Sequence, residues 1–230
     1  YDQSFESRRA YMLPVNDWQT PGEHSFTFDG AAGTLEAILT QPTTLPGPYV
    51  ALLGHPHSLQ GGSMNNKVVT TMARAFRELN IPSLRFNFRG VGASQGVYDA
   101  GAGESEDMLA LMRLWHAAFP DTRFIFAGFS FGSYVAWRAA AQSPHALLIS
   151  IAPAVHHYDY KALPAPHPWC VIQGDDDEVV PAQLVLDFAA QAVPPLPIVR
   201  FAETGHFFHG KLLELKTALI EMVEEQVLRS

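Results

Sequence analysis

A serine placed between two glycines could act as a nucleophile in this sequence. Ser130 stands between Gly128 and Gly132, after the apolar strand pattern of residues 123–127 and before the helical pattern of residues 133–140. This spacing is typical of a nucleophile elbow, a sharp turn in which larger flanking side chains would collide with the neighbouring strand and helix. The serine backbone is strained there, and its hydroxyl is exposed at the carboxyl edge of a sheet. A glycine-flanked helix cap is the alternative interpretation.

The candidate base lies close to the end of the chain. A serine hydroxyl needs a base to remove its proton and an acid to orient that base. His206 follows the last predicted strand and is preceded by Gly205, which lets the loop turn inward. His209 falls instead at the start of the last predicted helix and lacks such a glycine. Among the ten histidines, we therefore predict His206 as the base.

The candidate acid lies in a loop that carries four successive carboxylates. Asp175, Asp176, Asp177 and Glu178 follow a predicted strand and precede a predicted helix. Neighbouring carboxylates repel one another, and such a run is usually a solvated loop. Periodicity alone leaves open which of the four carboxylates faces the histidine.

Strand and helix patterns alternate along most of the chain. Two paired strands are predicted over 24–28 and 34–40, and further strands over 49–53, 82–88, 123–127, 145–151, 168–173 and 197–201. Helices are predicted over 64–79, 106–119, 133–140 and 182–191, and apolar residues stripe a last helix over 212–222. This order indicates an α/β fold in which helices cover both faces of a mostly parallel sheet. Its sites lie at the carboxyl ends of the strands, where all the candidate residues fall.

The length, the charge and the cysteine content limit the class of protein. The 230 residues fit one α/β domain, so we predict an N-terminal arm over 1–22 and a catalytic domain over 23–230. A net charge of −8 argues against nucleic acid and anionic membranes as partners, and no apolar run could span a bilayer. The single cysteine, Cys170, lies in an apolar strand, which suits the cytoplasm. Because the chain starts at Tyr1 and not at a methionine, it stays open whether a targeting segment has been removed.

Three motifs together resemble the α/β-hydrolase superfamily of the Ser-Asp-His type. They are the glycine-flanked Ser130, the spacing Gly174-x-x-Asp177-x-x-x-Pro181, and the Gly-His-Phe-Phe segment around His206. In that family the acid stands three residues after the glycine. The resemblance therefore selects Asp177 over the other carboxylates.

Two further segments resemble small bacterial serine hydrolases that lack a lid domain. They are the Arg-Gly-Val-Gly-Ala-Ser turn of residues 89–94 and the His-Pro-His loop of residues 55–67, in which Ser58 replaces a proline that is usual there. The resemblance covers about residues 24–228. It implies a single-domain fold with a mostly parallel sheet, helices on both faces and no large lid.

The resemblance also implies an activity. We expect a serine esterase that cleaves carboxylic esters of small or short-acyl substrates through an acyl-enzyme on Ser130, with Asp177 and His206 completing the triad. The backbone N–H groups of Phe131 and His57 are predicted to bind the oxyanion, with Leu59 as the alternative to His57. No metal and no cofactor are expected. The expected partner is a small-molecule ester, and the expected state is a monomer or a small homo-oligomer.

Other functions remain open at this point. A thioesterase or an amidase would use the same triad, and a non-catalytic hydrolase-fold binding protein would not react with a serine-directed probe. A metal-dependent hydrolase could use His55, His57, His156 and His157 with the acidic loop. The glycines of residues 90–96 have the wrong spacing for dinucleotide binding.

Overall fold

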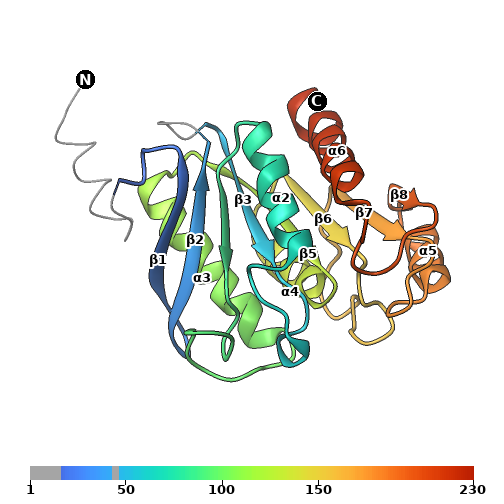
Figure 1. Ribbon diagram of the computed structural model, residues 1–230, viewed down its shortest axis with the longest axis horizontal. Helices are drawn as coiled ribbons and strands as arrows, with labels where there is room; N and C mark the ends of the chain where they lie inside the picture. Colours follow the sequence, from blue (N-terminus) through green and yellow to red (C-terminus); the bar gives the residue numbers. More distant parts are fainter. Residues whose placement is uncertain (1–16, 43–46) are drawn as a thin grey trace.

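An eight-stranded sheet forms the centre of the molecule (Figure 1). The computed structural model describes residues 17–42 and 47–230, so residues 1–16 of the predicted N-terminal arm lie outside the described part. The strand order is β1-β2-β4-β3-β5-β6-β7-β8. Only the two pairs β1–β2 and β2–β4 are antiparallel, which confirms the predicted mostly parallel sheet.

The strands end where the candidate residues begin. The antiparallel hairpin joins β1 (Gly22–Gly30) to β2 (Gly33–Gln41). The remaining strands are β3 (Tyr49–Gly54), β4 (Ser83–Phe86), β5 (Arg123–Phe129), β6 (Leu147–Ile151), β7 (Trp169–Gly174) and β8 (Ile198–Phe201).

Helices cover both faces of this sheet (Figure 1). On one face lie α2 (Lys67–Glu78) and α6 (Leu212–Val223), which continues into the short π-helix η2 (Glu224–Leu228). On the other face lie α3 (Ala102–Ala118), α4 (Phe131–Ala140) and α5 (Ala182–Gln191). A short 3₁₀-helix, η1 (Ser58–Gln60), lies in the loop after β3.

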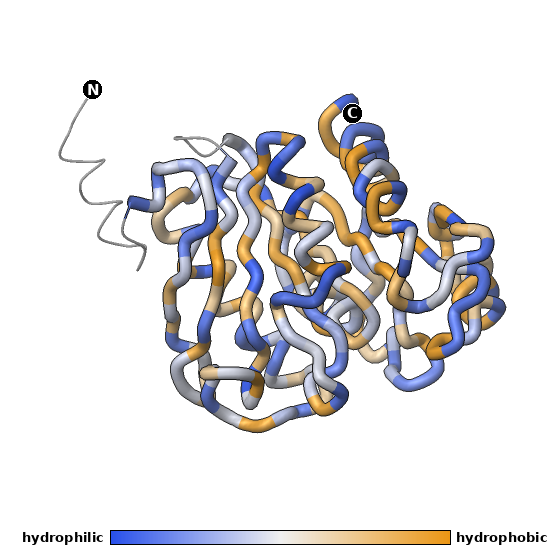
Figure 2. Tube along the Cα trace, viewed as in Figure 1, coloured by the Kyte–Doolittle hydropathy of each residue, from blue (hydrophilic) through white to orange (hydrophobic). Residues whose placement is uncertain are grey.

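The central strands consist mostly of apolar residues, as in β3 and β5 (Figure 2). Side chains of a strand point alternately to the two faces. Val50 and Leu52 accordingly join the cluster formed with α3, α4 and α5, whereas Ala51 and Leu53 join the cluster formed with α2 and α6. Burial on both faces explains why these strands carry continuous apolar runs and no polar alternation.

Side-chain caps decide where two helices begin. The helix α2 begins at Lys67, three residues after the predicted start, because the Asn66 side chain accepts the N–H of Val68 at 2.8 Å. The helix α3 begins at Ala102, four residues before its predicted start. There the buried Glu104 carboxylate accepts the N–H of Gly101 at 3.1 Å and closes the first turn.

Within residues 17–42 and 47–230, no lid covers the carboxyl edge of the sheet. The segment between β6 and β7, residues 152–168, contains turns and bends but neither helix nor strand. The fold prediction, including the missing lid, is therefore confirmed. In the described parts of the chain, no helix combines the length and apolar character that a membrane crossing needs.

We expect Gly132→Ala to destabilise the fold, because α4 begins in direct contact with the end of β3. A Cβ atom on Gly132 would overlap the backbone of Gly54 and His55, which cannot move aside as a side chain could. Urea unfolding should show a loss of about 1–3 kcal/mol in the free energy of unfolding. Gly47→Ala is the control, because a Cβ there meets no atom of the described residues within 4 Å. Equal stability of the two variants would contradict the close contact.

Candidate active site

Ser130 occupies a strained turn between β5 and α4. Its backbone angles, φ 56° and ψ −118°, lie in a region that residues other than glycine rarely adopt, at a cost of about 1–3 kcal/mol. Its N–H donates to the carbonyl of Ile151 at 2.9 Å, and its own carbonyl accepts the N–H of Ser133 at 3.0 Å. A Cβ on Gly128 would overlap the backbone of Gly132, so the tight turn requires glycine there. The turn holds the Ser130 hydroxyl at the carboxyl edge of the sheet.

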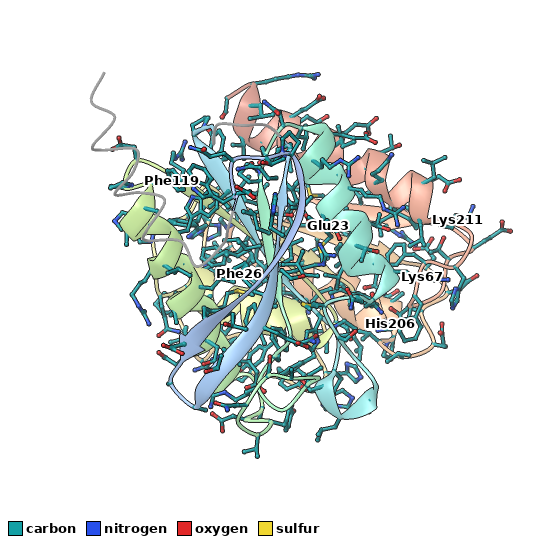
Figure 3. The ribbon with its side chains drawn as sticks, turned by 60° about the vertical axis from the view of Figure 1, so that its left-hand side comes forward. Glu23, Phe26, Lys67, Phe119, His206 and Lys211 are labelled. Atoms are coloured by element: carbon teal, nitrogen blue, oxygen red, sulfur yellow. The ribbon has the colours of Figure 1, made fainter. Side chains whose placement is uncertain are left out.

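The structure brings the three predicted triad residues together. Nε2 of His206 lies 3.1 Å from Oγ of Ser130, and Nδ1 of His206 lies 2.8 Å from Oδ2 of Asp177. All three residues are buried, with His206 2% exposed. His206 lies on the same side of the molecule as the N-terminal end of α2, which Lys67 marks in Figure 3. An Nδ1–H that donates to Asp177 leaves Nε2 free to accept the serine O–H.

The Asp177 carboxylate is held by more than the histidine. Its Oδ1 accepts the backbone N–H of Val179 at 2.9 Å and of Val180 at 2.7 Å, and its Oδ2 also accepts Nε2 of Gln173 at 3.1 Å. Burial by itself raises the pKa of Asp177, but its hydrogen bond and charge interaction with His206 and the two backbone donors outweigh burial. The pKa of Asp177 therefore lies below its ordinary value, and the carboxylate is ionised at neutral pH.

The neighbouring carboxylates have other surroundings. Asp175 forms a salt bridge with Arg200 at 2.9 Å, and Asp176 is exposed. Glu178 accepts the backbone N–H of His206 at 3.2 Å, so it holds the histidine loop without touching the ring nitrogens. Of the four carboxylates, Asp177 is the one that binds the imidazole.

A small cavity of about 100 Å³ opens beside Ser130. Its lining includes Pro56, His57, Gly62, Val179 and Phe207. A larger cavity of about 550 Å³ lies at the other end of β5, beside Arg123 and His145, and contains none of the predicted site residues. We take the smaller cavity as the candidate substrate site because both Ser130 and His206 line it.

The two predicted oxyanion donors lie next to this serine. Phe131 is the first residue of α4, and His57 lines the cavity. Within the described residues, neither backbone N–H has a hydrogen-bond partner, so both are free to bind an oxygen. The alternative donor, the N–H of Leu59, is already bonded to Nδ1 of His57 at 3.2 Å. The geometry thus favours His57 over Leu59.

The histidines proposed as metal ligands do not assemble a ligand set. His55 is buried, and both of its ring nitrogens lie within hydrogen-bond distance of backbone atoms, the Pro56 carbonyl and the Phe88 N–H. His156 and His157 are exposed and lie ring against ring, 3.8 Å apart. Across residues 17–42 and 47–230, no three His, Cys, Asp or Glu side chains are grouped as a metal would require.

Three residues support the site in roles that the sequence analysis did not predict, although Glu178 was among the candidate acids. Gln173 and Glu178 bind the acid and the histidine loop, and Asn87 accepts the N–H of Met64 at 2.9 Å at the end of the loop after β3. Gln173 is the one amide in a strand that is otherwise apolar. A buried polar side chain needs a hydrogen-bond partner, so this residue could have been singled out from the sequence. No comparable signal marked Glu178, which stands in the run of carboxylates.

Comparisons with known proteins bear on the fold and the family of this chain. No protein-family model matches the chain. The uncharacterized protein RP471 of Rickettsia prowazekii is 38% identical over 203 residues, which cover 84% of this chain and 85% of that protein.

Two solved structures are similar over nearly their whole length. XC6422 of Xanthomonas campestris, described as an α/β serine hydrolase without a lid, is 43% identical with a TM-score of 0.85 over 90% of this chain and 95% of that one. An α/β serine hydrolase homologue from Coxiella burnetii is 42% identical with a TM-score of 0.81 over 86% and 96%. This chain therefore belongs to the α/β-hydrolase superfamily, in the subgroup of serine hydrolases without a lid.

Proposed function

We propose that the protein hydrolyses carboxylic esters with short acyl groups, using Ser130 as nucleophile, His206 as base and Asp177 as the acid. The observation that carries this proposal is the unbroken hydrogen-bonded chain from the Ser130 hydroxyl through the imidazole to the Asp177 carboxylate. Its partner is a small-molecule ester, and neither a cofactor nor a metal takes part in the proposed reaction. Cytoplasmic localisation and a monomer or small homo-oligomer remain predictions.

The proposed reaction has two stages. His206 takes the proton of Ser130 while Oγ attacks the ester carbonyl carbon, and Asp177 stabilises the imidazolium that forms. The negative charge on the carbonyl oxygen is bound by the N–H groups of Phe131 and His57, and the helix dipole of α4 adds to this at Phe131. The imidazolium then protonates the departing alkoxide, which leaves an acyl group on Ser130. Water, activated by the same histidine, hydrolyses the acyl-enzyme.

The preference for short acyl groups rests on the volume of the site. A cavity of about 100 Å³ is small beside the roughly 300–1,000 Å³ of sites that take drug-sized ligands. This small volume supports a preference for acetyl to butyryl groups over longer chains. Phe207 and Val179 stand in its wall and restrict longer chains.

Ser130→Ala should abolish covalent labelling by a fluorophosphonate probe, because the alanine has no oxygen to attack phosphorus. The wild-type protein should be labelled at one site, which peptide mass spectrometry would locate. Ser133→Ala is a matched control, since the Ser133 hydroxyl is buried and bonded to the Ser130 carbonyl at 2.7 Å and to the hydroxyl of Tyr160 at 2.9 Å. Labelling that persists in Ser130→Ala would disprove the assignment.

Asp177→Asn should lower kcat for a p-nitrophenyl ester by about 10³- to 10⁴-fold, because the amide removes the charge that fixes the tautomer and stabilises the imidazolium. Asp176→Asn is the control in the same loop, because Asp176 is exposed and should stay within about twofold. If the two variants lose activity equally, Asp177 is not the acid.

The wild-type enzyme should hydrolyse p-nitrophenyl acetate and butyrate and lose kcat/KM by roughly tenfold or more at eight carbons, because the longer chain exceeds the cavity. The same acyl groups presented as thioesters and as anilides test the alternative activities. A rate that rises with chain length would contradict the short-acyl proposal, and faster cleavage of the thioester or anilide would replace it.

A further inference from the structure

The peptide between Pro56 and His57 borders the cavity beside Ser130. It is trans, because the cis peptides of the described residues are those before Pro168 and Pro194. In a trans peptide the C=O and the N–H lie in one rigid plane and point in opposite directions. Whatever fixes the Pro56 carbonyl therefore also fixes the direction of the His57 N–H.

His55 holds that carbonyl. Its Nδ1 lies 2.7 Å from the Pro56 oxygen, and its Nε2 lies 3.0 Å from the backbone nitrogen of Phe88. A backbone nitrogen can only donate, so Nε2 must be the accepting nitrogen and Nδ1 must carry the proton. The ring thus donates to the loop after β3 and accepts from the segment that follows β4.

The surroundings of His55 leave the ring little freedom. Its side chain is fully buried and lies against the Phe88 ring, with centroids 3.9 Å apart. Burial lowers the pKa of His55 to about 4, so the ring is neutral at the pH where an esterase works. A neutral ring with one fixed tautomer keeps both backbone contacts in place.

Gly62 confines the same carbonyl. A Cβ on Gly62 would overlap the Pro56 oxygen, and the N–H of Gly62 donates to the His57 carbonyl at 3.0 Å. The Pro56–His57 peptide is thus held by the His55 ring through a hydrogen bond and by the Gly62 backbone through close packing.

We propose that His55 is a positioning residue for the oxyanion site: its Nδ1–H fixes the Pro56 carbonyl so that the His57 N–H faces the reacting oxygen beside Ser130. This inference rests on the proposed esterase function. A hydrogen bond to the carbonyl also polarises the peptide, which makes its N–H a stronger donor. Because the oxyanion exists only near the transition state, loss of His55 Nδ1–H should lower kcat and leave KM nearly unchanged.

Two variants separate the two ring nitrogens. His55→Asn keeps a donor at the position of Nδ1, whereas His55→Gln places its terminal amide near the position of Nε2. Each variant loses one of the two hydrogen bonds, so both should be destabilised in urea unfolding by similar amounts. We expect kcat for p-nitrophenyl acetate to fall about 10- to 100-fold in His55→Gln, toward the roughly 10²- to 10³-fold cost of losing an oxyanion donor. In His55→Asn, the fall in kcat should be several-fold smaller than in His55→Gln.

The ranking of the two variants decides the proposal. Three outcomes would show that His55 is only a packing residue: the two variants lose kcat equally, the loss of kcat follows the loss of unfolding free energy, or KM rises while kcat is kept.

A spectroscopic measurement on the wild-type protein tests the hydrogen bond from His55 to the Pro56 carbonyl without an activity assay. The ¹⁵N shifts of the His55 ring should show the Nδ1–H tautomer at pH 7, and the Nε2–H tautomer would overturn the proposal even if both variants fail to fold. Absence of esterase activity and probe labelling in a wild-type protein with the Nδ1–H tautomer would refute the proposed function instead.

Discussion

The structure of the site depends on how closely one helix can approach two strands. The helix α4 begins immediately after Ser130, and its first turn packs against the backbone of β3 and β5 at Gly54 and Gly128. Side chains at these glycines or at Gly132 would separate the helix from the sheet. Where the helix meets the sheet, Ser130 has its strained conformation, and α4 begins with Phe131, whose N–H has no hydrogen-bond partner among the described residues. The proposed nucleophile and one proposed oxyanion donor therefore share one packing constraint.

The remaining groups come from loops that backbone hydrogen bonds tie together. Asp177 is anchored by the N–H groups of Val179 and Val180, and Glu178 binds the backbone of His206, so the acid and histidine loops are joined at two points. The Asp177 carboxylate accepts hydrogen bonds from His206, Gln173 and the two backbone N–H groups. These donors stabilise the ionised form of the buried carboxylate. Such a preorganised site need not rearrange when charge develops during the reaction.

Much of this arrangement could be predicted from the residues, for identifiable reasons. Apolar runs and helical stripes reflect burial, so they predicted the strands and helices, and their alternation predicted the parallel sheet. The helix ends were less accurate because single side chains such as Asn66 and Glu104 set them. Spacing could not select Asp177 from its neighbours, since the loop conformation decides which carboxylate turns inward. The family resemblance supplied that choice.

Other parts of the site left only weak signals in the sequence. His55 was a possible metal ligand because His-Pro-His has suitable spacing. In the structure, however, its Nδ1 contacts the carbonyl of the next residue, Pro56, and its Nε2 contacts the N–H of Phe88, 33 residues further along the chain. Gln173 and Glu178 act through contacts that depend on tertiary structure. Periodicity carries information on which face is buried, but none on the direction of a hydrogen bond across a loop.

If Ser130, activated by His206, attacks the ester, it carries the acyl group during turnover, and pre-steady-state kinetics with p-nitrophenyl acetate can detect this intermediate. We expect an acetyl group on the peptide that contains Ser130 when the reaction is quenched by acid within the first turnovers. We also expect a burst of p-nitrophenol, at most one equivalent per protein, if deacylation is the slower step. Turnover of the ester with no acetylated Ser130 under any quench condition, or acetylation at another residue, would show that Ser130 is not the nucleophile.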